Sequence, residues 1–188
     1  MTSGQATAAG AIGRLRALLL EGGGLMARLV ESSSAADPDL DPSQAPSPAA
    51  IAAEGPRAAG RREDYELLVE AIYEGYLLHY GEPRVVRVPD ADLRLLAGDR
   101  LYAVGLARLV ELGDTCAVAE LADTITLSAL AQGAGSVKLA DAVWQAGARA
   151  VGWGASELHT RAKELVLAGA PEALEAMRTS ATVASAAH

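Results

Sequence analysis

The sequence predicts an all-α fold, an antiparallel bundle of about six helices preceded by a disordered N-terminal arm. Hydrophobic residues make up 51% of the 188 residues, and after residue 60 they recur at helical spacing through most of the chain. Phenylalanine is absent, so leucine, valine and alanine must fill the core. Side chains of this kind favour closely packed helices over a sheet sandwich.

The first 60 residues differ in composition from the rest of the chain. Two short amphipathic stretches within residues 12–30 are interrupted by three consecutive glycines, and residues 32–50, SSSAADPDLDPSQAPSPAA, have the composition of a flexible linker. We therefore divide the chain into a flexible arm at 1–60 and a helical domain at 61–183, and expect the core to survive removal of residues 1–58. The amphipathic stretches have an alternative interpretation, a tethered helix that docks on a partner or back on the domain.

Glycine, proline and short polar residues divide the rest of the chain into helices. The first is expected over residues 63–80, where Gly81 and Pro83 follow. After an extended connector, Asp90 is expected to cap a helix that ends at residue 112, and Asp114 to cap a helix over residues 115–132.

Three more helices complete the predicted bundle. Ser136 is the expected cap of a helix over residues 137–151, Ser156 is the cap of the next one, and Pro171 begins the last. The short links between these helices predict that neighbours run antiparallel.

Composition and charge argue against several functional classes. The net charge is −8 and no basic stripe is present, so nucleic-acid binding is not expected. No apolar run approaches the roughly 20 residues of a membrane span. The single cysteine, Cys116, excludes a disulfide fold, fits the reducing cytosol and is expected to be a small buried filler. We expect a cytoplasmic protein without a cofactor.

Three glutamates stand four residues apart on the first predicted helix of the domain. Glu66, Glu70 and Glu74 therefore share one helical face. Carboxylates in this arrangement can bind metal in di-iron bundles, but those sites also need Glu-x-x-His motifs on other helices, and no histidine of this chain follows a glutamate at that spacing. The row is expected to form a solvated face.

Two other residues stand out at helix ends. His79 is placed to stabilise the C-terminus of the helix that carries the glutamates. Trp153 lies between two glycines, which indicates a surface lid or an anchor for a partner, whereas Trp144 lies on an apolar face and is expected to be buried.

The segment at residues 95–109, LLAGDRLYAVGLARL, is an amphipathic helix pattern with a Gly-Asp pair where the helix should continue. Here the chain resembles the all-α trans-isoprenyl diphosphate synthases. The resemblance covers about residues 65–135, and its motifs are short. It rests on Leu95-Leu96-Ala97-Gly98-Asp99, on Tyr102, on Glu111-Leu112-Gly113-Asp114 and, loosely, on Gln132-Gly133.

The chain departs from this family at the positions that carry catalysis. The family holds Mg²⁺ and the allylic diphosphate with two Asp-Asp-x-x-Asp clusters, whereas this sequence contains no Asp-Asp pair. Its segment 77–86, LLHYGEPRVV, stands where the family has the end of its first aspartate-rich helix. The resemblance therefore implies a catalytically silent relative, similar to the small subunit of heptaprenyl diphosphate synthases.

Two interpretations of the Gly-Asp pair remain open. In the first, Gly98 lets two helices approach closely and Asp99 caps a restarted helix. In the second, the pair is a local kink, and Asp99 forms a salt bridge with Arg94 or Arg100.

The function predicted from the sequence is that of a non-catalytic helical protein-interaction domain, an accessory subunit of an isoprenoid (polyprenyl diphosphate) synthase. The alternative is a small all-α enzyme, or a binder of a hydrophobic ligand in a pocket within the bundle. A protein partner or homo-oligomer is expected, and no catalytic, cofactor-binding or metal-binding residue is assigned. The candidate interaction or structural residues are His79, Arg84, Gly98, Asp99, Tyr102 and Trp153.

Overall fold

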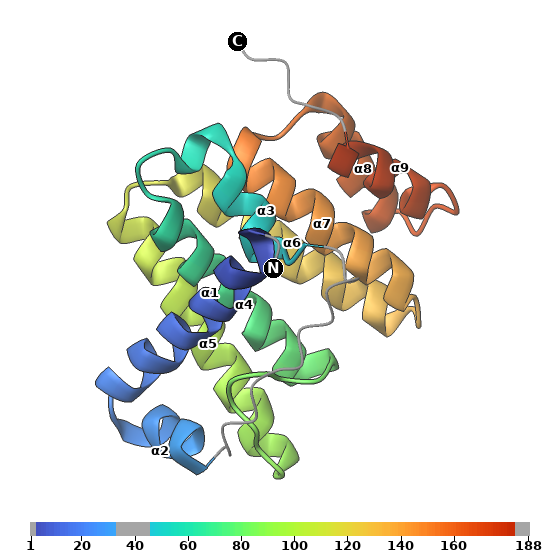
Figure 1. The fold of residues 1–188 in the computed structure, drawn as a ribbon. Coiled ribbons are helices and arrows are strands. Elements are labelled where there is room, and N and C mark those ends of the chain that lie inside the picture. Colours follow the sequence, from blue (N-terminus) through green and yellow to red (C-terminus); the bar gives the residue numbers. More distant parts are fainter. Residues whose placement is uncertain (1–2, 33–45, 183–188) are drawn as a thin grey trace. The chain divides into compact units, whose positions relative to one another are not determined.

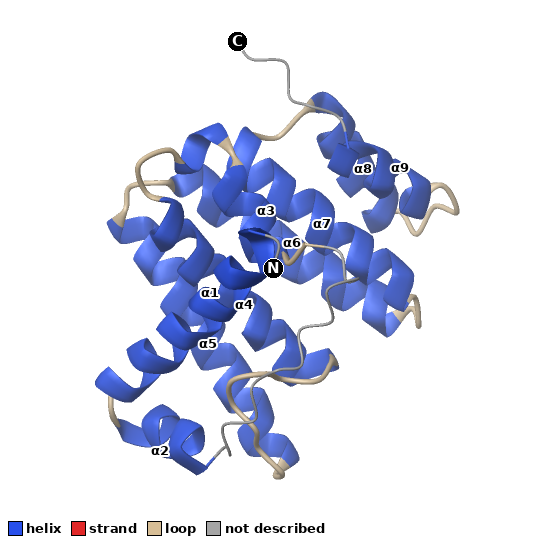
Figure 2. Cartoon of the chain, in the orientation of Figure 1, coloured by secondary structure: helices blue, strands red, loops and turns tan. Residues whose placement is uncertain are grey.

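The computed structural model describes residues 3–32 and 46–182, and these residues confirm the all-α prediction. They form nine α-helices and one short 3₁₀ helix, and the described part of the chain contains no strand (Figures 1 and 2). None of these helices is long and apolar enough to cross a membrane.

The helices belong to two compact units. Unit 1 comprises residues 1–50 and 63–108, and unit 2 comprises residues 51–62 and 109–188. The described residues from Arg62 onward do form six α-helices, as predicted, but they are divided between the two units, so a single antiparallel bundle of six is not confirmed.

Unit 1 is built from four helices. They are α1 (Ser3–Glu21), α2 (Gly24–Ser32), α4 (Arg62–Tyr80) and the greater part of α5 (Ala91–Glu111). A non-helical connector with bends joins α4 to α5 at the prolines Pro83 and Pro89, and Asp90 caps α5, as predicted, by accepting a hydrogen bond from the backbone N–H of Leu93 at 2.8 Å.

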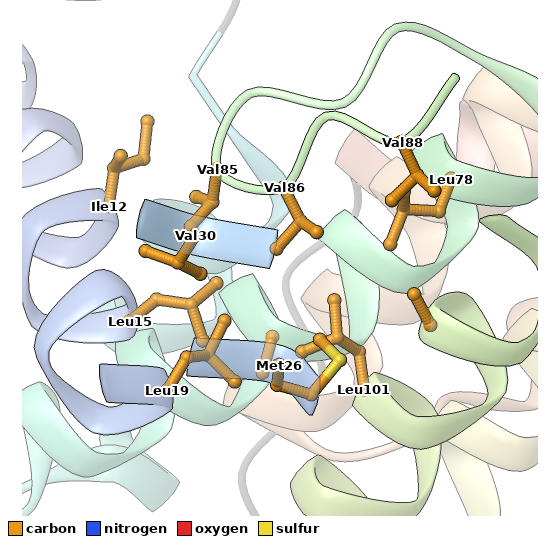
Figure 3. Packing of buried hydrophobic residues seen from close by; sticks show 12 residues of the cluster. Ile12, Leu15, Leu19, Met26, Val30, Leu78, Val85, Val86, Val88 and Leu101 are labelled. Carbon is orange, nitrogen blue, oxygen red and sulfur yellow. The ribbon is translucent and has the colours of Figure 1, made fainter. Parts of the chain in front are cut away.

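The N-terminal helices supply part of the core of unit 1. Leu15 of α1 and Val30 of α2 are fully buried, together with Leu78 of α4, Val86 of the connector and Leu101 of α5. Figure 3 shows the apolar side chains of α1 and α2 facing those of the connector.

Within the arm predicted at 1–60, the structure describes helical segments. The described residues of this arm include two helices whose apolar faces lie in the core, which is the docking alternative stated above, and the short helix α3 (Pro48–Glu54) within the expected linker. The rest of that linker, residues 33–45, lies outside the described residues. Because removal of residues 1–58 would take Leu15 and Val30 from the core, survival of that deletion is no longer the expected outcome.

Unit 2 contains α6 (Thr115–Gly133), α7 (Val137–Trp153), α8 (Glu157–Leu167), α9 (Ala173–Thr182) and the 3₁₀ helix η1 (Pro56–Ala58). Helix α7 packs against α6, α9 and η1, and α8 packs against α6 and α9. Trp144 of α7 is buried, as expected, and the core of the unit includes Val143, Ala162 and Met177.

Two of the three predicted caps in unit 2 are confirmed. Asp114 accepts a hydrogen bond from the backbone N–H of Ala117 at 3.0 Å, and Ser156 accepts one from that of His159 at 3.2 Å. Ser136 directly precedes α7 but makes no capping hydrogen bond with its side chain. The expectation for Cys116 is wrong, because this thiol is exposed at the start of α6 rather than buried.

A polar network joins α6 and α8. Lys163 donates hydrogen bonds to both carboxylate oxygens of Glu120 at 3.1 Å, and the Nε2 atom of His159 lies 3.2 Å from one of them. Burial alone would raise the pKa of Glu120, but the hydrogen bonds from His159 and Lys163 outweigh it and hold this pKa below its ordinary value. The network therefore keeps a charged carboxylate at the junction of these helices.

The burial of α1 can be tested with Leu15→Ala. Deleting a fully buried leucine should lower the free energy of unfolding by about 2–4 kcal/mol, measured by urea denaturation followed by circular dichroism. Leu20→Ala on the same helix removes a side chain that is 38% exposed and should cost distinctly less. Equal and small losses in both variants would show that α1 does not belong to the core.

Candidate functional site

The candidate site lies in unit 1, where α4 and α5 approach each other closely. Three buried glycines allow this approach. A Cβ atom on Gly75 would lie 2.9 Å from the carbonyl oxygen of Gly98, a Cβ on Gly98 would overlap the ring of His79, and a Cβ on Gly105 would overlap the side chain of Ile72. Since each glycine removes a steric barrier at one level of the contact, the two helices can pack backbone to backbone.

The structure agrees in part with each of the two interpretations of the Gly98-Asp99 pair. Gly98 does serve close helix approach, but α5 continues through it without a restart, so Asp99 caps nothing. Asp99 pairs with His79, at 3.2 Å between the carboxylate and Nε2, and not with Arg94. Its carboxylate remains 67% exposed.

Arg94 fastens α5 to the C-terminus of α4. Its guanidinium donates hydrogen bonds to the carbonyl oxygens of Leu78 at 2.6 Å, of Leu77 at 3.3 Å and of Gly81. The last carbonyls of a helix lack partners within the helix and carry its negative dipole end, so a cation from the next helix is well suited to them. Arg94 therefore stabilises the helix end at which His79 also lies.

Aromatic side chains surround His79. Its ring stacks on Tyr102 of α5 with 5.3 Å between centroids and lies 5.7 Å from the ring of Tyr80. Burial raises the pKa of the Tyr102 hydroxyl, so Tyr102 is neutral and acts as a packing group. Four of the six residues singled out from the sequence, His79, Gly98, Asp99 and Tyr102, thus meet at one contact between α4 and α5.

The glutamate row of α4 is buried, so the prediction of a solvated face is wrong. Glu66, Glu70 and Glu74 are 3%, 0% and 0% exposed. Arg14 of α1 pairs with Glu66 at 2.5 Å, and Arg84 of the connector pairs with Glu70. Two guanidinium groups from outside α4 therefore contact the face of the helix that was predicted to face solvent.

Glu74 holds the connector through its backbone. One carboxylate oxygen, Oε1, accepts hydrogen bonds from the N–H groups of Arg84 at 2.7 Å, Val85 at 2.6 Å and Val86 at 3.3 Å. The other oxygen, Oε2, lies 3.4 Å from the Arg84 guanidinium. Arg84, the fifth candidate residue, is thus the central cation of the cluster.

Within this cluster, the pKa of the Glu70 carboxyl is raised. Burial is the main cause that raises its pKa, and the neighbouring Glu74 adds to this, while Arg84 opposes it. Glu70 Oε2 accepts no hydrogen bond. Among the described residues, no group of three histidine, cysteine, aspartate or glutamate side chains is arranged to hold a metal ion.

A groove of about 500 Å³ opens at the end of unit 1 where α4 meets the connector and α5 begins. Tyr80 and Leu95 are 45% and 47% exposed, and Leu96, next to them on α5, is 62% exposed. The groove is lined by Leu78, His79, Tyr80, Gly81, Glu82, Pro89, Ala91, Arg94 and Leu95.

Sequence reasoning missed most of this groove because its walls come from the end of one helix, the connector and the start of the next. The signals that were present are an aromatic residue directly before the helix-ending Gly81 and adjacent leucines at the start of α5.

Trp153, the sixth candidate residue, belongs to unit 2. It is the last residue of α7 and is partly buried, and the Arg149 guanidinium lies 3.9 Å from the centre of its ring. This cation–π contact covers one face of the indole, so Trp153 is less open than a surface lid would be.

The comparisons with known proteins do not assign a function, so the function is argued from the geometry described above. The chain matches no protein family, no curated protein and no solved structure.

Gly98→Ala tests the helix contact, because two effects of opposite sign compete. Alanine is the better helix former by about 1 kcal/mol, but its methyl group would overlap the His79 ring, so we expect a net loss of about 1–3 kcal/mol in the free energy of unfolding. Gly13→Ala is the matched control, since Gly13 lies within α1 with no atom near its missing Cβ, and it should gain up to about 1 kcal/mol. A gain in both variants would show that α4 and α5 do not touch at Gly98.

Glu74→Ala tests the buried cluster. The change leaves three backbone N–H groups without their acceptor and removes one of the two carboxylates that pair with Arg84, so unfolding should become easier by about 3–5 kcal/mol, measured by urea denaturation. Glu82→Ala, at an exposed position in the same connector, should stay within about 0.5 kcal/mol of the unmodified chain. A Glu74→Ala variant as stable as Glu82→Ala would contradict the described role of this carboxylate.

Proposed function

We propose that this chain is a non-catalytic helical protein-interaction domain that acts as an accessory subunit of a polyprenyl diphosphate synthase. The observation that carries the non-catalytic part is the use of the α4 carboxylates. Glu66, Glu70 and Glu74 are engaged by Arg14, by Arg84 and by backbone N–H groups. Carboxylates that are needed to hold the fold together are poorly placed to gather Mg²⁺ around a diphosphate.

The resemblance to prenyl synthases supports the accessory role, and the positions of its residues fit such a role. Gly98 and Tyr102, which carry part of that resemblance, both serve the α4–α5 contact. A helical domain whose buried acidic residues serve its own structure is suited to bind a catalytic partner rather than to act alone.

The surface at the end of unit 1 is the best candidate for the partner contact. Tyr80 and Leu95 line the groove and are partly exposed, and Leu96, which follows Leu95 on α5, is more exposed. Tyrosine and leucine side chains at a concave site supply the apolar anchors that interfaces use.

The alternative function, binding of a hydrophobic small ligand, is supported by the size of the same groove. A volume of about 500 Å³ is within the range of small-molecule sites. The mixed polar and apolar character of its lining, with Glu82, His79 and Arg94 among the residues, favours the protein partner.

A prenyl transfer assay tests the proposal. The purified chain should form no product from farnesyl diphosphate, isopentenyl diphosphate and Mg²⁺, and when added to a catalytic polyprenyl diphosphate synthase it should change the rate or the product length. Leu95→Ser should remove that change, whereas Leu25→Ser, at a similarly exposed leucine of α2, should preserve it.

Each other result of the assay has a defined meaning. Turnover by the chain alone would overturn the non-catalytic proposal. The absence of any effect in the mixture would overturn the accessory role, and saturable binding of farnesyl diphosphate that is lost in Leu95→Ser would favour the hydrophobic ligand.

A further inference from the structure

Two carboxyl oxygens in the core of unit 1 have no hydrogen-bond donor. Glu70 Oε2 and Glu74 Oε2 are both buried, and neither accepts a hydrogen bond in the structure. Glu74 Oε2 has an ionic contact with Arg84 Nε, but at 3.4 Å this contact is not a hydrogen bond. Since a buried carboxylate oxygen is normally satisfied by a donor, these two oxygens call for a physical explanation.

The two oxygens belong to neighbouring side chains. Glu70 and Glu74 stand four residues apart on α4, so their carboxyl groups lie one turn apart on the same face of the helix. An ionised carboxylate can only accept hydrogen bonds, whereas a protonated carboxyl donates one through its O–H. A single proton on one of the two groups therefore supplies the donor that the other lacks.

The charges in this part of the core also favour a proton. Among the described residues, Arg84 is the cation that pairs with both Glu70 and Glu74. The next glutamate of the row, Glu66, pairs with a different cation, Arg14 of α1. If both Glu70 and Glu74 were ionised, two negative charges would share one guanidinium in a buried position, which is costly. One proton restores the balance.

The contacts of the two carboxyl groups indicate that Glu70 is the protonated one. Glu74 Oε1 accepts three backbone N–H groups, and hydrogen bonds from several donors favour an ionised acceptor. Glu70 accepts a hydrogen bond from Arg84 alone. Burial is the largest influence on the pKa of Glu70 and raises it, Arg84 lowers it, and the charges of Glu74 and Glu66 raise it further.

We propose that Glu70 keeps a proton in the folded protein and donates a hydrogen bond to Glu74 Oε2, so that the hold of Glu74 on the connector depends on pH. Loss of the proton sets two negative charges against one guanidinium and loosens the segment at Arg84, Val85 and Val86. The unfolded chain releases the same proton at the ordinary carboxyl pKa, so unit 1 loses stability as the pH rises toward the pKa of folded Glu70. This inference goes beyond the proposed function, because it holds for any partner.

Carbon NMR of the full chain, labelled with ¹³C at the glutamate carboxyl groups, tests the proton directly. At pH 6 the Glu70 carbon should have the chemical shift of a protonated carboxyl, although a glutamate with the ordinary pKa of about 4.3 is ionised there. When the pH is raised further, the backbone N–H signals of Val85 and Val86 should move with the same midpoint as the Glu70 carbon. In Glu70→Gln this common movement should be absent.

Urea denaturation at a series of pH values tests the effect on stability. Glu70→Gln replaces the proton with a permanent amide donor. Relative to this variant, the unfolding equilibrium constant of the unmodified chain should increase with pH, by up to about tenfold per pH unit above the ordinary carboxyl pKa. The matched control is Glu82→Gln, which removes an exposed carboxyl from the connector and should keep the pH dependence of the unmodified chain.

Three results would contradict the inference. An ionised Glu70 at pH 6 would overturn it, and so would an equal pH dependence of Glu70→Gln and Glu82→Gln. A protonated Glu70 whose release leaves the signals of Val85 and Val86 unchanged would reject the link to the connector. If Glu70→Gln does not fold, the carboxyl signal of the unmodified chain, assigned through the backbone of Glu70, still decides between a protonated and an ionised group.

Discussion

One carboxylate oxygen of Glu74 accepts hydrogen bonds from three consecutive backbone N–H groups of the connector. The connector is not helical and bends at Arg84 and Val85, so these groups have no helical partners, and leaving a buried one without an acceptor would cost about 1–3 kcal/mol. By accepting them, Glu74 places Val85 and Val86 over the core and determines where α5 can begin. The rest of unit 1 depends on this interaction, because α1 and α2 pack on the surface that the connector completes (Figure 3).

The same arrangement has an electrostatic consequence. A carboxylate fixed in the core requires a cation, which Arg84 supplies from the connector that Glu74 holds, so the backbone contact and the charge contact stabilise each other. Glu70 shares Arg84 with Glu74, and its raised pKa reflects burial beside a second carboxylate. A buried ion cluster of this kind gives little net stability compared with an apolar core, but breaking one partner is costly. It is therefore better understood as a device that fixes the position of the connector.

The fold class and most helix boundaries followed from local chemistry, and for that reason they could be predicted. Capping by Asp90, Asp114 and Ser156 depends on hydrogen bonds across three residues, which the sequence displays directly. The burial of Glu70 and Glu74 could not be predicted in the same way, because it depends on Arg84. This residue lies outside α4, in the connector, and reaches the two glutamates only after the chain turns back. For a related reason the sequence could offer the docking of α1 on the domain only as an alternative: the apolar stripe of α1 is visible in the sequence, but the surface it covers is assembled from α4, the connector and α5.

These constraints meet at the groove. Glu74 fixes the connector that carries Glu82 and Pro89, Arg94 fastens the start of α5 to the end of α4, and the glycine contact at Gly98 sets the distance between the two helices. The connector, the end of α4 and the start of α5 are thus each held by a contact with another of these segments. These contacts favour a groove that is already formed before a partner binds. A preformed site requires little ordering on binding, so most of the interaction energy is retained as affinity. A recognition surface at this end of unit 1 is therefore a consequence of the buried contacts that hold the unit together, and a substitution at Glu74 should weaken partner binding through the connector even though its side chain is fully buried away from the groove.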